Sequence, residues 1–406
     1  MRISPSRLRI AGAILVVALV IALTSSAATG SFPLWLRHAV PAPAAAPSTA
    51  NSSSPRPSGH RTSDTLPPLS PAQLAGQRVI YSYGGLKPPS SLLQLIRHGE
   101  AAGVIFFSQN VSSSAQLAKV IVELDQASDS PQNPVHEPLL LMTDQEGGEI
   151  RRVPGPPLLS EQQIGDSADP PAQAANAGTT AASNLRGMGL TVNLAPVIDV
   201  YRQPDDFDEQ FGRSYSTNPS VVARLGADFI TAQQRAGVAA TAKHFPGLGT
   251  AARQQDTDEQ PVTLNVPLAT IRNTDELPYY DAIAAGVKLV MVSWAVYPAL
   301  DPHRPAGLSS TIVGGELRQR LRFGGVTITD ALEAGALRPY GPVSNRALLA
   351  AEAGMDLLLA SQRNVHEGEQ AAAGLEAGYH DGALGKPAYT AALQRVLALR
   401  ASLAAG

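Results

Sequence analysis

The stretch VAATAKHFPGLG, residues 238–249, decides the fold prediction. It begins with an apolar run, continues with Lys243 and His244, and ends in a turn of proline and glycine. A continuous apolar run is typical of a strand that is buried on both faces, as strands of parallel sheets are. Polar side chains at the end of such a strand are typical of the carboxyl-terminal rim of a parallel barrel, where ligands bind. A capped strand with a hydrogen-bonded histidine is the structural alternative.

Seven more apolar runs resemble this one, and amphipathic segments such as 114–127, 172–189 and 219–237 separate them. The eight predicted strands are residues 78–83, 103–107, 138–144, 191–197, 238–244, 289–296, 325–331 and 355–360. Strands that alternate with helices predict a parallel sheet, and eight such units predict a single (β/α)8 barrel of the TIM type. We assign this α/β domain to residues 75–406 and expect its last helix, near 387–404, to pack against the outside of the barrel.

The N-terminal residues 1–30 predict export. Arginines precede an apolar run, IAGAILVVALVIAL at 10–23, and small residues follow it at 24–30. This order is that of a signal peptide, but the apolar run approaches the length of a membrane span. The segment is therefore either a cleaved signal or an anchor, with a possible membrane tether through residues 10–28.

Residues 31–74 are rich in proline, alanine and serine. Such a composition offers too few apolar side chains to offset the entropy of ordering, so it predicts a disordered linker. A linker between an export segment and a barrel predicts a protein that is secreted or membrane-anchored, with an extracytoplasmic folded domain.

Composition excludes several classes of function. The formal net charge is −3, and no basic stripe is present, which argues against a nucleic-acid partner. The chain has no cysteine, which excludes disulfides, thiolate metal sites and a cysteine nucleophile. No metal-ligand spacing and no phosphate-binding glycine loop occur, so we expect neither a metal nor an organic cofactor.

Several motifs occur in a fixed order between about residues 75 and 360. They are GVIFFSQN (103–110), DQEGGEIRR (144–152), NLAPVIDV (193–200), FGRSYSTNP (211–219), KHFPG (243–247), RPAGLS (304–309) and GVTITDAL (325–332). Together they resemble glycoside hydrolase family 3, and most of all its bacterial β-N-acetylhexosaminidase branch. The resemblance implies a retaining β-glycosidase that hydrolyses terminal β-linked N-acetylglucosamine from glycans or cell-wall fragments, including muropeptides.

The resemblance also implies roles for residues at the ends of the predicted strands. Asp330 matches the nucleophile, and its alternative is a helix N-cap. The predicted substrate-binding residues, which suit sugar hydroxyls and an acetamido carbonyl, are Asp144, Arg152, Arg213, Lys243 and His244. A surface or structural ion pair is the alternative for each. Asn193, Asp199 and Ser293 also lie at strand ends, and the first two are equally consistent with ordering the loops.

The general acid/base is where this sequence departs from the family pattern. The branch carries a second histidine at the position of Leu248, and a catalytic histidine where this chain has Asp258. We expect a carboxylate from Asp258, Asp256 or Glu259 to replace it, with a pKa raised by burial or by neighbouring charge. His303, from the loop after the sixth strand, is a further alternative.

Two other functions stay open. One is a catalytically impaired protein that binds glycans, because loss of an acid/base reduces the rate by about 10² to 10⁴. The other is a glycosidase of different specificity, such as a β-glucosidase or β-xylosidase.

Overall fold

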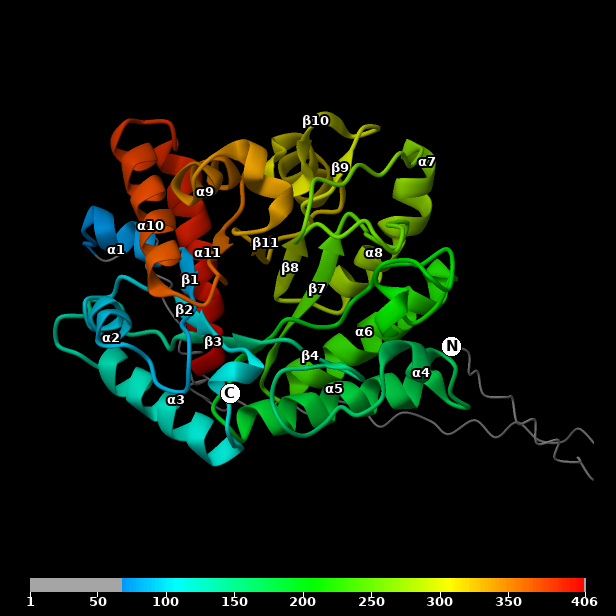
Figure 1. The fold of residues 1–406 in the computed structure, drawn as a ribbon, viewed down its shortest axis with the longest axis horizontal. Helices are drawn as coiled ribbons and strands as arrows, with labels where there is room; N and C mark the ends of the chain where they lie inside the picture. Colours follow the sequence, from blue (N-terminus) through cyan, green and yellow to red (C-terminus); the bar gives the residue numbers. More distant parts are fainter. Residues whose placement is uncertain (1–67, 405–406) are drawn as a thin grey trace, which may run out of the picture. The chain divides into compact units, whose positions relative to one another are not determined.

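Residues 68–404 are described by a computed structural model, in which eight parallel strands form a closed barrel (Figure 1). The barrel strands are β1 (Val79–Tyr81), β2 (Gly103–Ile105), β3 (Leu140–Thr143), β6 (Val192–Asn193), β7 (Ala239–Phe245), β8 (Leu289–Val292), β11 (Val326–Ala331) and β12 (Leu357–Leu359). Each strand pairs with its neighbours in chain order, and the pairing of β1 with β12 closes the ring. The predicted barrel is confirmed, and each of the eight predicted apolar runs overlaps one of its strands; β7 extends one residue beyond its run.

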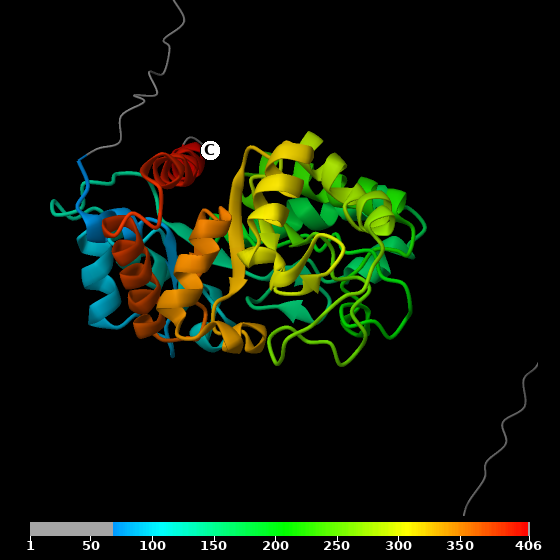
Figure 2. The same ribbon diagram turned by 90° about the horizontal axis from the view of Figure 1, so that it is seen from above.

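A helical segment follows each strand and covers the outside of the barrel (Figures 1 and 2). These segments are α2 (Ser90–Arg97), α3 (Ser114–Ser128), α5 (Pro170–Arg186), α6 (Pro219–Arg235), α8 (Leu277–Ala284), η5 (Thr311–Arg320), α9 (Val343–Ala353) and α10 (Val365–His380). Several begin at a polar cap: the side chain of Asn364, for example, accepts a hydrogen bond from the backbone of Glu367 at the start of α10.

The strands are buried on both faces, as their sequences predict. Alternate residues such as Ile105, Met142 and Leu289 point into the barrel, while their neighbours Val104 and Val290 belong to the layer under the helices. The interior is therefore filled with side chains, and only the rim of the barrel is open to a ligand.

The last helix, α11 (Lys386–Ala404), is placed differently from the expectation. Val396 and Leu399 pack against residues of the barrel interior, so α11 covers the amino-terminal end of the barrel instead of its outer wall. The buried guanidinium of Arg400 donates to the carbonyl oxygens of Pro138 (2.8 Å) and Glu137 (2.6 Å), just before β3. It also donates to the side chain of Gln77, just before β1.

The N-terminal predictions fall mainly outside the described residues. The signal or anchor at 1–30 lies outside them, as does most of the linker at 31–74. The helix α1 (Pro71–Gly76) corrects the end of that linker, because Ser70 caps it and Ala75 is buried in the core. Within residues 68–404, no helix combines the length and apolarity needed to cross a membrane.

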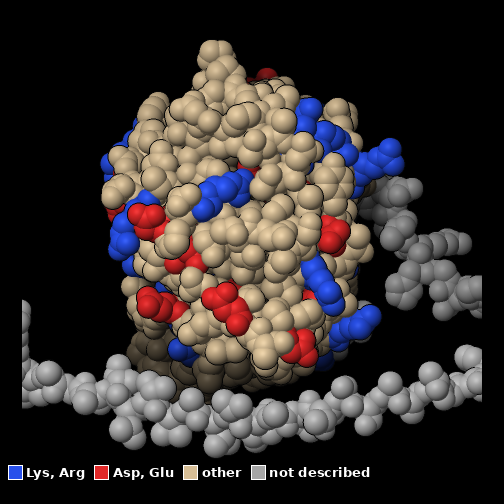
Figure 3. Space-filling model, turned by 90° about the vertical axis from the view of Figure 1, so that its right-hand side faces the viewer, with Lys and Arg blue, Asp and Glu red and all other residues tan. Residues whose placement is uncertain are grey.

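On the face shown in Figure 3, acidic and basic side chains are interspersed among uncharged ones. Such a face offers no continuous basic surface to a polyanion.

Candidate active site

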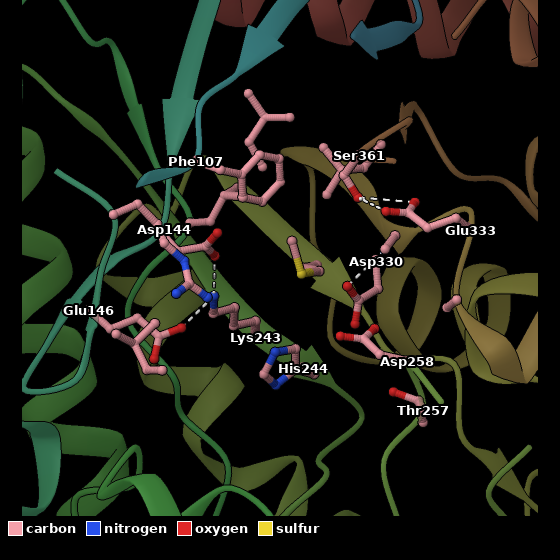
Figure 4. Close-up of a pocket in the computed structure, with 18 of the residues that line it drawn as sticks. Phe107, Asp144, Glu146, Lys243, His244, Thr257, Asp258, Asp330, Glu333 and Ser361 are labelled. Atoms are coloured by element: carbon pink, nitrogen blue, oxygen red, sulfur yellow. Dashed lines mark hydrogen bonds and ion pairs between the residues drawn. The ribbon is translucent and has the colours of Figure 1, made fainter. Parts of the chain in front are cut away.

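A cavity of about 880 Å³ opens where the barrel strands end. Its floor consists of apolar side chains from the strands, and its walls come from the loops that follow them. All eight predicted catalytic and substrate-binding residues line it: Asp144, Arg152, Arg213, Lys243, His244, Asp256, Asp258 and Asp330. Figure 4 shows two walls, with the carboxylates of Asp258 and Asp330 on one and the Lys243 network on the other.

Lys243, at the end of β7, is the centre of the second wall. Its buried ammonium group donates to Asp144 Oδ1 at 2.9 Å and forms an ion pair with Glu146 Oε1 at 2.7 Å. Glu146 is a functional residue that the sequence analysis missed. The sequence could have indicated Glu146, because this residue lies two positions after Asp144 and alternate residues of an extended strand share a face.

Arg213 completes this network. Its guanidinium contacts both carboxylate oxygens of Glu146, at 2.8 and 3.0 Å, and Asp208 Oδ1 at 2.6 Å. Burial would raise the pKa of Glu146, but the charges of Arg213 and Lys243 outweigh it and hold this pKa well below its usual range. The network therefore stays ionised at neutral pH and holds both cations in fixed positions.

His244 is neutral, and one of its ring nitrogens is an acceptor with only a long contact. Its Nδ1 lies 2.7 Å from Asp199 Oδ2, and its backbone N–H also donates to this carboxylate. Burial, with the charges of Arg213 and Lys243, lowers the pKa of His244 to about 4, although Asp208 opposes the shift. A proton on Nδ1 leaves the lone pair of Nε2 available to a hydroxyl group; Arg213 Nη2 lies 3.5 Å from it.

Asp199, Asp208 and His244 are also the one group of described residues whose donor atoms could surround a metal ion, all within 4.8 Å of one another. Asp199 and His244 are hydrogen-bonded to each other, and Asp208 is paired with Arg213. Among residues 68–404, Asp208 Oδ2 is buried without a hydrogen-bond partner, so hydrogen bonds and an ion pair account for this cluster except for that oxygen.

Asp330 lies near the end of β11 and points into the cavity (Figure 4). Its Oδ1 accepts the backbone N–H of Ala331 at 2.8 Å. Burial raises the pKa of Asp330, while His244 and Lys243 oppose the increase. The helix-cap alternative is wrong, because the strand runs to Ala331 and the next helical turn begins only at Gly335.

Asp258 lies on the loop after β7. The carboxylate of Asp256 accepts its backbone N–H at 2.8 Å, which bends the loop toward the cavity. Two backbone hydrogen bonds then fix this loop to the segment after β11: Gly335 donates to Asp258 O (2.6 Å) and Ala336 donates to Thr257 O (3.0 Å). The segment that follows Asp330 therefore holds the loop that carries Asp258.

The environment of Asp258 favours its protonated form. Desolvation raises its pKa to about 7, together with the negative charges of Asp330, Asp256 and Glu333. A carboxyl group with this pKa can exist in either protonation state at neutral pH, which is the property that a general acid/base needs.

Other residues that the sequence placed at the rim lie outside the cavity lining. Asn193 bonds to the backbone of Gln145, and Asp199 lies behind His244. Ser293 is buried against Tyr297, and His303 is exposed on β10 (Asp301–Pro305). Besides Glu146, the sequence analysis missed Asp208 and Glu333; both lie in irregular loops, where no periodic pattern marks them.

Glycoside hydrolases use a pair of carboxyl groups, and this barrel carries such a pair beside fixed hydrogen-bond donors at its rim. Comparison with known proteins gives the family: residues 72–399 match the glycosyl hydrolase family 3 N-terminal domain. This chain belongs to glycoside hydrolase family 3.

Individual relatives agree with this assignment. A protein of Arthroderma benhamiae named as an uncharacterized secreted glycosyl hydrolase is 45% identical over 82% of this chain and 93% of its own length. A beta-hexosaminidase of Thioalkalivibrio sulfidiphilus is 34% identical over 66% of this chain and 75% of its own. The family 3 beta-N-acetylglucosaminidase of Paenibacillus sp. superposes with a TM-score of 0.77 at 33% identity, over 83% of this chain and 64% of that protein.

Proposed function

We propose that this protein is a retaining β-N-acetylhexosaminidase, in which Asp330 is the nucleophile and Asp258 the general acid/base. The observation that carries the proposal is the pair of carboxyl groups at one wall of the cavity. Burial raises the pKa of both groups, but at Asp330 the neighbouring His244 and Lys243 oppose the increase, whereas at Asp258 the neighbouring carboxylates add to it and the pKa is about 7. Glycoside hydrolysis requires one carboxyl group that is charged and one that is protonated, and different surroundings give two carboxyl groups these different states.

The proposed reaction has two steps. In the first, an Asp330 oxygen attacks the anomeric carbon, the glycosidic bond breaks, and the proton of Asp258 passes to the leaving oxygen. In the second, Asp258 removes a proton from water, which attacks the same carbon and releases Asp330. The ester formed in the first step removes the charge of Asp330, so the pKa of Asp258 falls when its role changes from acid to base.

The other wall suits the non-reducing sugar. Asp144 is partly exposed to the cavity, and His244 lines it with an Nε2 atom whose contact to Arg213 is long, at 3.5 Å, so both residues can bind hydroxyl groups. Arg152 Nε is buried without a hydrogen-bond partner, which leaves a donor for a ligand oxygen. The names of the hexosaminidase and acetylglucosaminidase relatives support a 2-acetamido sugar as the substrate.

We further propose that the enzyme is exported and acts on glycans of the cell wall or on their fragments. Support comes from the charged and apolar N-terminal sequence and from the relative that is named as secreted.

The test compares the full-length protein with its Asp330→Gly and Asp258→Ala variants. Wild type is expected to hydrolyse p-nitrophenyl N-acetyl-β-glucosaminide faster than the glucoside or xyloside. Asp330→Gly is expected to be inactive. Asp258→Ala is expected to release a burst of nitrophenol and then turn over slowly, because this leaving group needs little protonation, and to lose about 10² to 10⁴ in rate on an N-acetylglucosamine disaccharide.

The anomer of the product formed with azide distinguishes the role of Asp258 from that of Asp330. With Asp258→Ala it should attack the glycosyl-enzyme and yield the β-glycosyl azide, whereas with Asp330→Gly it should replace the nucleophile and yield the α-anomer. Wild type that binds N-acetylglucosamine but cleaves no nitrophenyl sugar would show a glycan-binding protein. Faster cleavage of the glucoside or xyloside would show a different glycosidase.

A further inference from the structure

Glu333 is a third carboxylate at the wall that holds Asp258 and Asp330. It lies in the turn after β11 and lines the same cavity (Figure 4). Ser361, which follows β12, directs its hydroxyl at this carboxylate, with distances of 2.9 and 3.1 Å to the two oxygens. The mechanism proposed above gives Glu333 no role, although it lies beside the reacting groups.

A second carboxyl group feels the charge of Glu333. Glu367, on α10, is buried and accepts the backbone N–H of Gln362 through Oε2, while its Oε1 is buried without a donor. Burial and the charge of Glu333 raise the pKa of Glu367 to about 8, although Arg346 opposes the shift. Glu367 Oε1 has no hydrogen-bond partner among the described residues, so the influence of Glu333 on Glu367 is mainly one of charge.

Ser361 is thus the hydrogen-bond donor that the structure gives to the Glu333 carboxylate. Hydrogen bonds to the charged form of a carboxylate stabilise that form. Among the charged groups that line the same cavity, Asp330 on β11, Asp256 on the same loop, Glu333 and Arg213 have the largest effects on the pKa of Asp258. Arg213 is the one cation among them, and Glu146 and Asp208 already balance its charge.

We propose that Glu333 is a positioning residue whose fixed negative charge keeps Asp258 protonated until the glycosidic bond breaks. This inference rests on the proposed function. An aspartate in water has a pKa of about 4, which is too low for a proton donor at neutral pH. Asp330 supplies part of the required negative charge but loses it in the glycosyl-enzyme, whereas Glu333 forms no bond to the sugar in the proposed reaction.

The test is the pH profile of kcat/KM for hydrolysis of an unactivated N-acetylglucosamine disaccharide by the full-length protein. Activity should fall as pH rises through the pKa of Asp258, because the first step needs its proton. Glu333→Gln removes the charge but can still accept the hydrogen bond of Ser361. It should move this alkaline limb down by about one pH unit, so that the rate falls about tenfold at pH 8 and little at pH 5.

Two variants serve as controls. Glu333→Asp retains the charge and should keep the limb near its wild-type position. Glu149→Gln makes the same charge change at an exposed position outside the cavity lining and should leave the profile unchanged. If Glu333→Gln fails to fold, Glu333→Ser makes the same comparison with a small hydroxyl group.

The possible failures are distinguishable. An active wild type whose alkaline limb is the same in Glu333→Gln would overturn this inference and leave the proposed function intact. If Glu333→Gln loses disaccharide hydrolysis at every pH, and azide restores turnover of the nitrophenyl substrate, Glu333 is itself the acid and the inference is wrong. An inactive wild type would refute the proposed function first.

Discussion

At the residue scale, the site depends on carboxyl groups held in different protonation states. Glu146 stays charged between Arg213 and Lys243, whereas the pKa of Asp258 is raised to about 7 by desolvation and by its acidic neighbours. Their side-chain chemistry is the same, so the difference comes from the charges around them. Because folding raises the pKa of Asp258, ionisation of this group destabilises the folded protein.

This destabilisation predicts a pH-dependent gain of stability in Asp258→Asn. Because the pKa of Asp258 is higher in the folded protein than in the unfolded chain, its contribution to stability is present below about pH 4 and is lost as pH rises through about 7. The Tm of the variant should therefore exceed that of wild type by an amount that grows from pH 4 to 7 and then stays constant. Thermal unfolding across this range measures it.

Asp205→Asn is the baseline for this measurement, since it removes a carboxyl group from an exposed loop position. A Tm difference for Asp258→Asn that does not change with pH, or that decreases as pH rises, would contradict the assigned environment of Asp258.

At the element scale, sequence reasoning identified the strands more completely than the site. Apolar runs such as 289–296 mark strands because burial on both faces requires them. Asp144 and Lys243 were predicted because they lie at the ends of these apolar runs. Asp208 and Glu333 were not, because their positions depend on loops whose course is fixed by tertiary contacts, such as the hydrogen bond from Ser361 to Glu333.

Gly335 tests how the loop after β7 is held. A Cβ atom at this position would lie 2.1 Å from the backbone oxygen of Glu259, so the two segments would have to separate. Gly335→Ala should displace Asp258 and reduce kcat/KM on the disaccharide by on the order of 10², because misplacement of a catalytic group by about 1 Å has effects of this size. Turnover of the nitrophenyl substrate should fall less.

Gly314→Ala is the matched control. A Cβ atom added at Gly314 would meet no atom of the described residues within 4 Å, so the activity of this variant should match wild type. Equal losses on both substrates in Gly335→Ala would indicate a general disruption of the cavity and not a displaced acid.

At the scale of the folded unit, residues 68–404, the two ends of the barrel have different tasks. Loops at the carboxyl-terminal end carry the cavity, while α11 covers the amino-terminal end and contacts residues just before β1 and β3. Stability and chemistry are thus assigned to opposite ends, as is general for such barrels.

Arg400→Met is expected to destabilise the protein without a specific effect on the site. It removes the donors of the Pro138 and Glu137 carbonyl groups and of Gln77; an acceptor without a partner costs about 1 to 3 kcal/mol when it is buried, as Gln77 is, and less at Pro138 and Glu137, which are half-buried. Urea unfolding should show a loss of roughly 2 to 5 kcal/mol, with an unchanged KM in the remaining folded protein.

Arg235→Met, at an exposed position of α6, should change the free energy of unfolding by less than about 0.5 kcal/mol. If Arg400→Met changed the free energy of unfolding equally little, the contacts of Arg400 between α11 and the amino-terminal end of the barrel would not stabilise the protein.

The loop that carries Asp258 is held through the main-chain oxygens of Thr257 and Asp258. Its position therefore does not depend on which side chain occupies residue 258. In the genetic code, histidine and aspartate codons can differ by a single base, so an ancestor with an imidazole here could acquire a carboxylate in one mutation without rebuilding the loop. Natural selection could then replace the residue at position 258 and adjust the pKa of the new side chain separately, through neighbours such as Glu333.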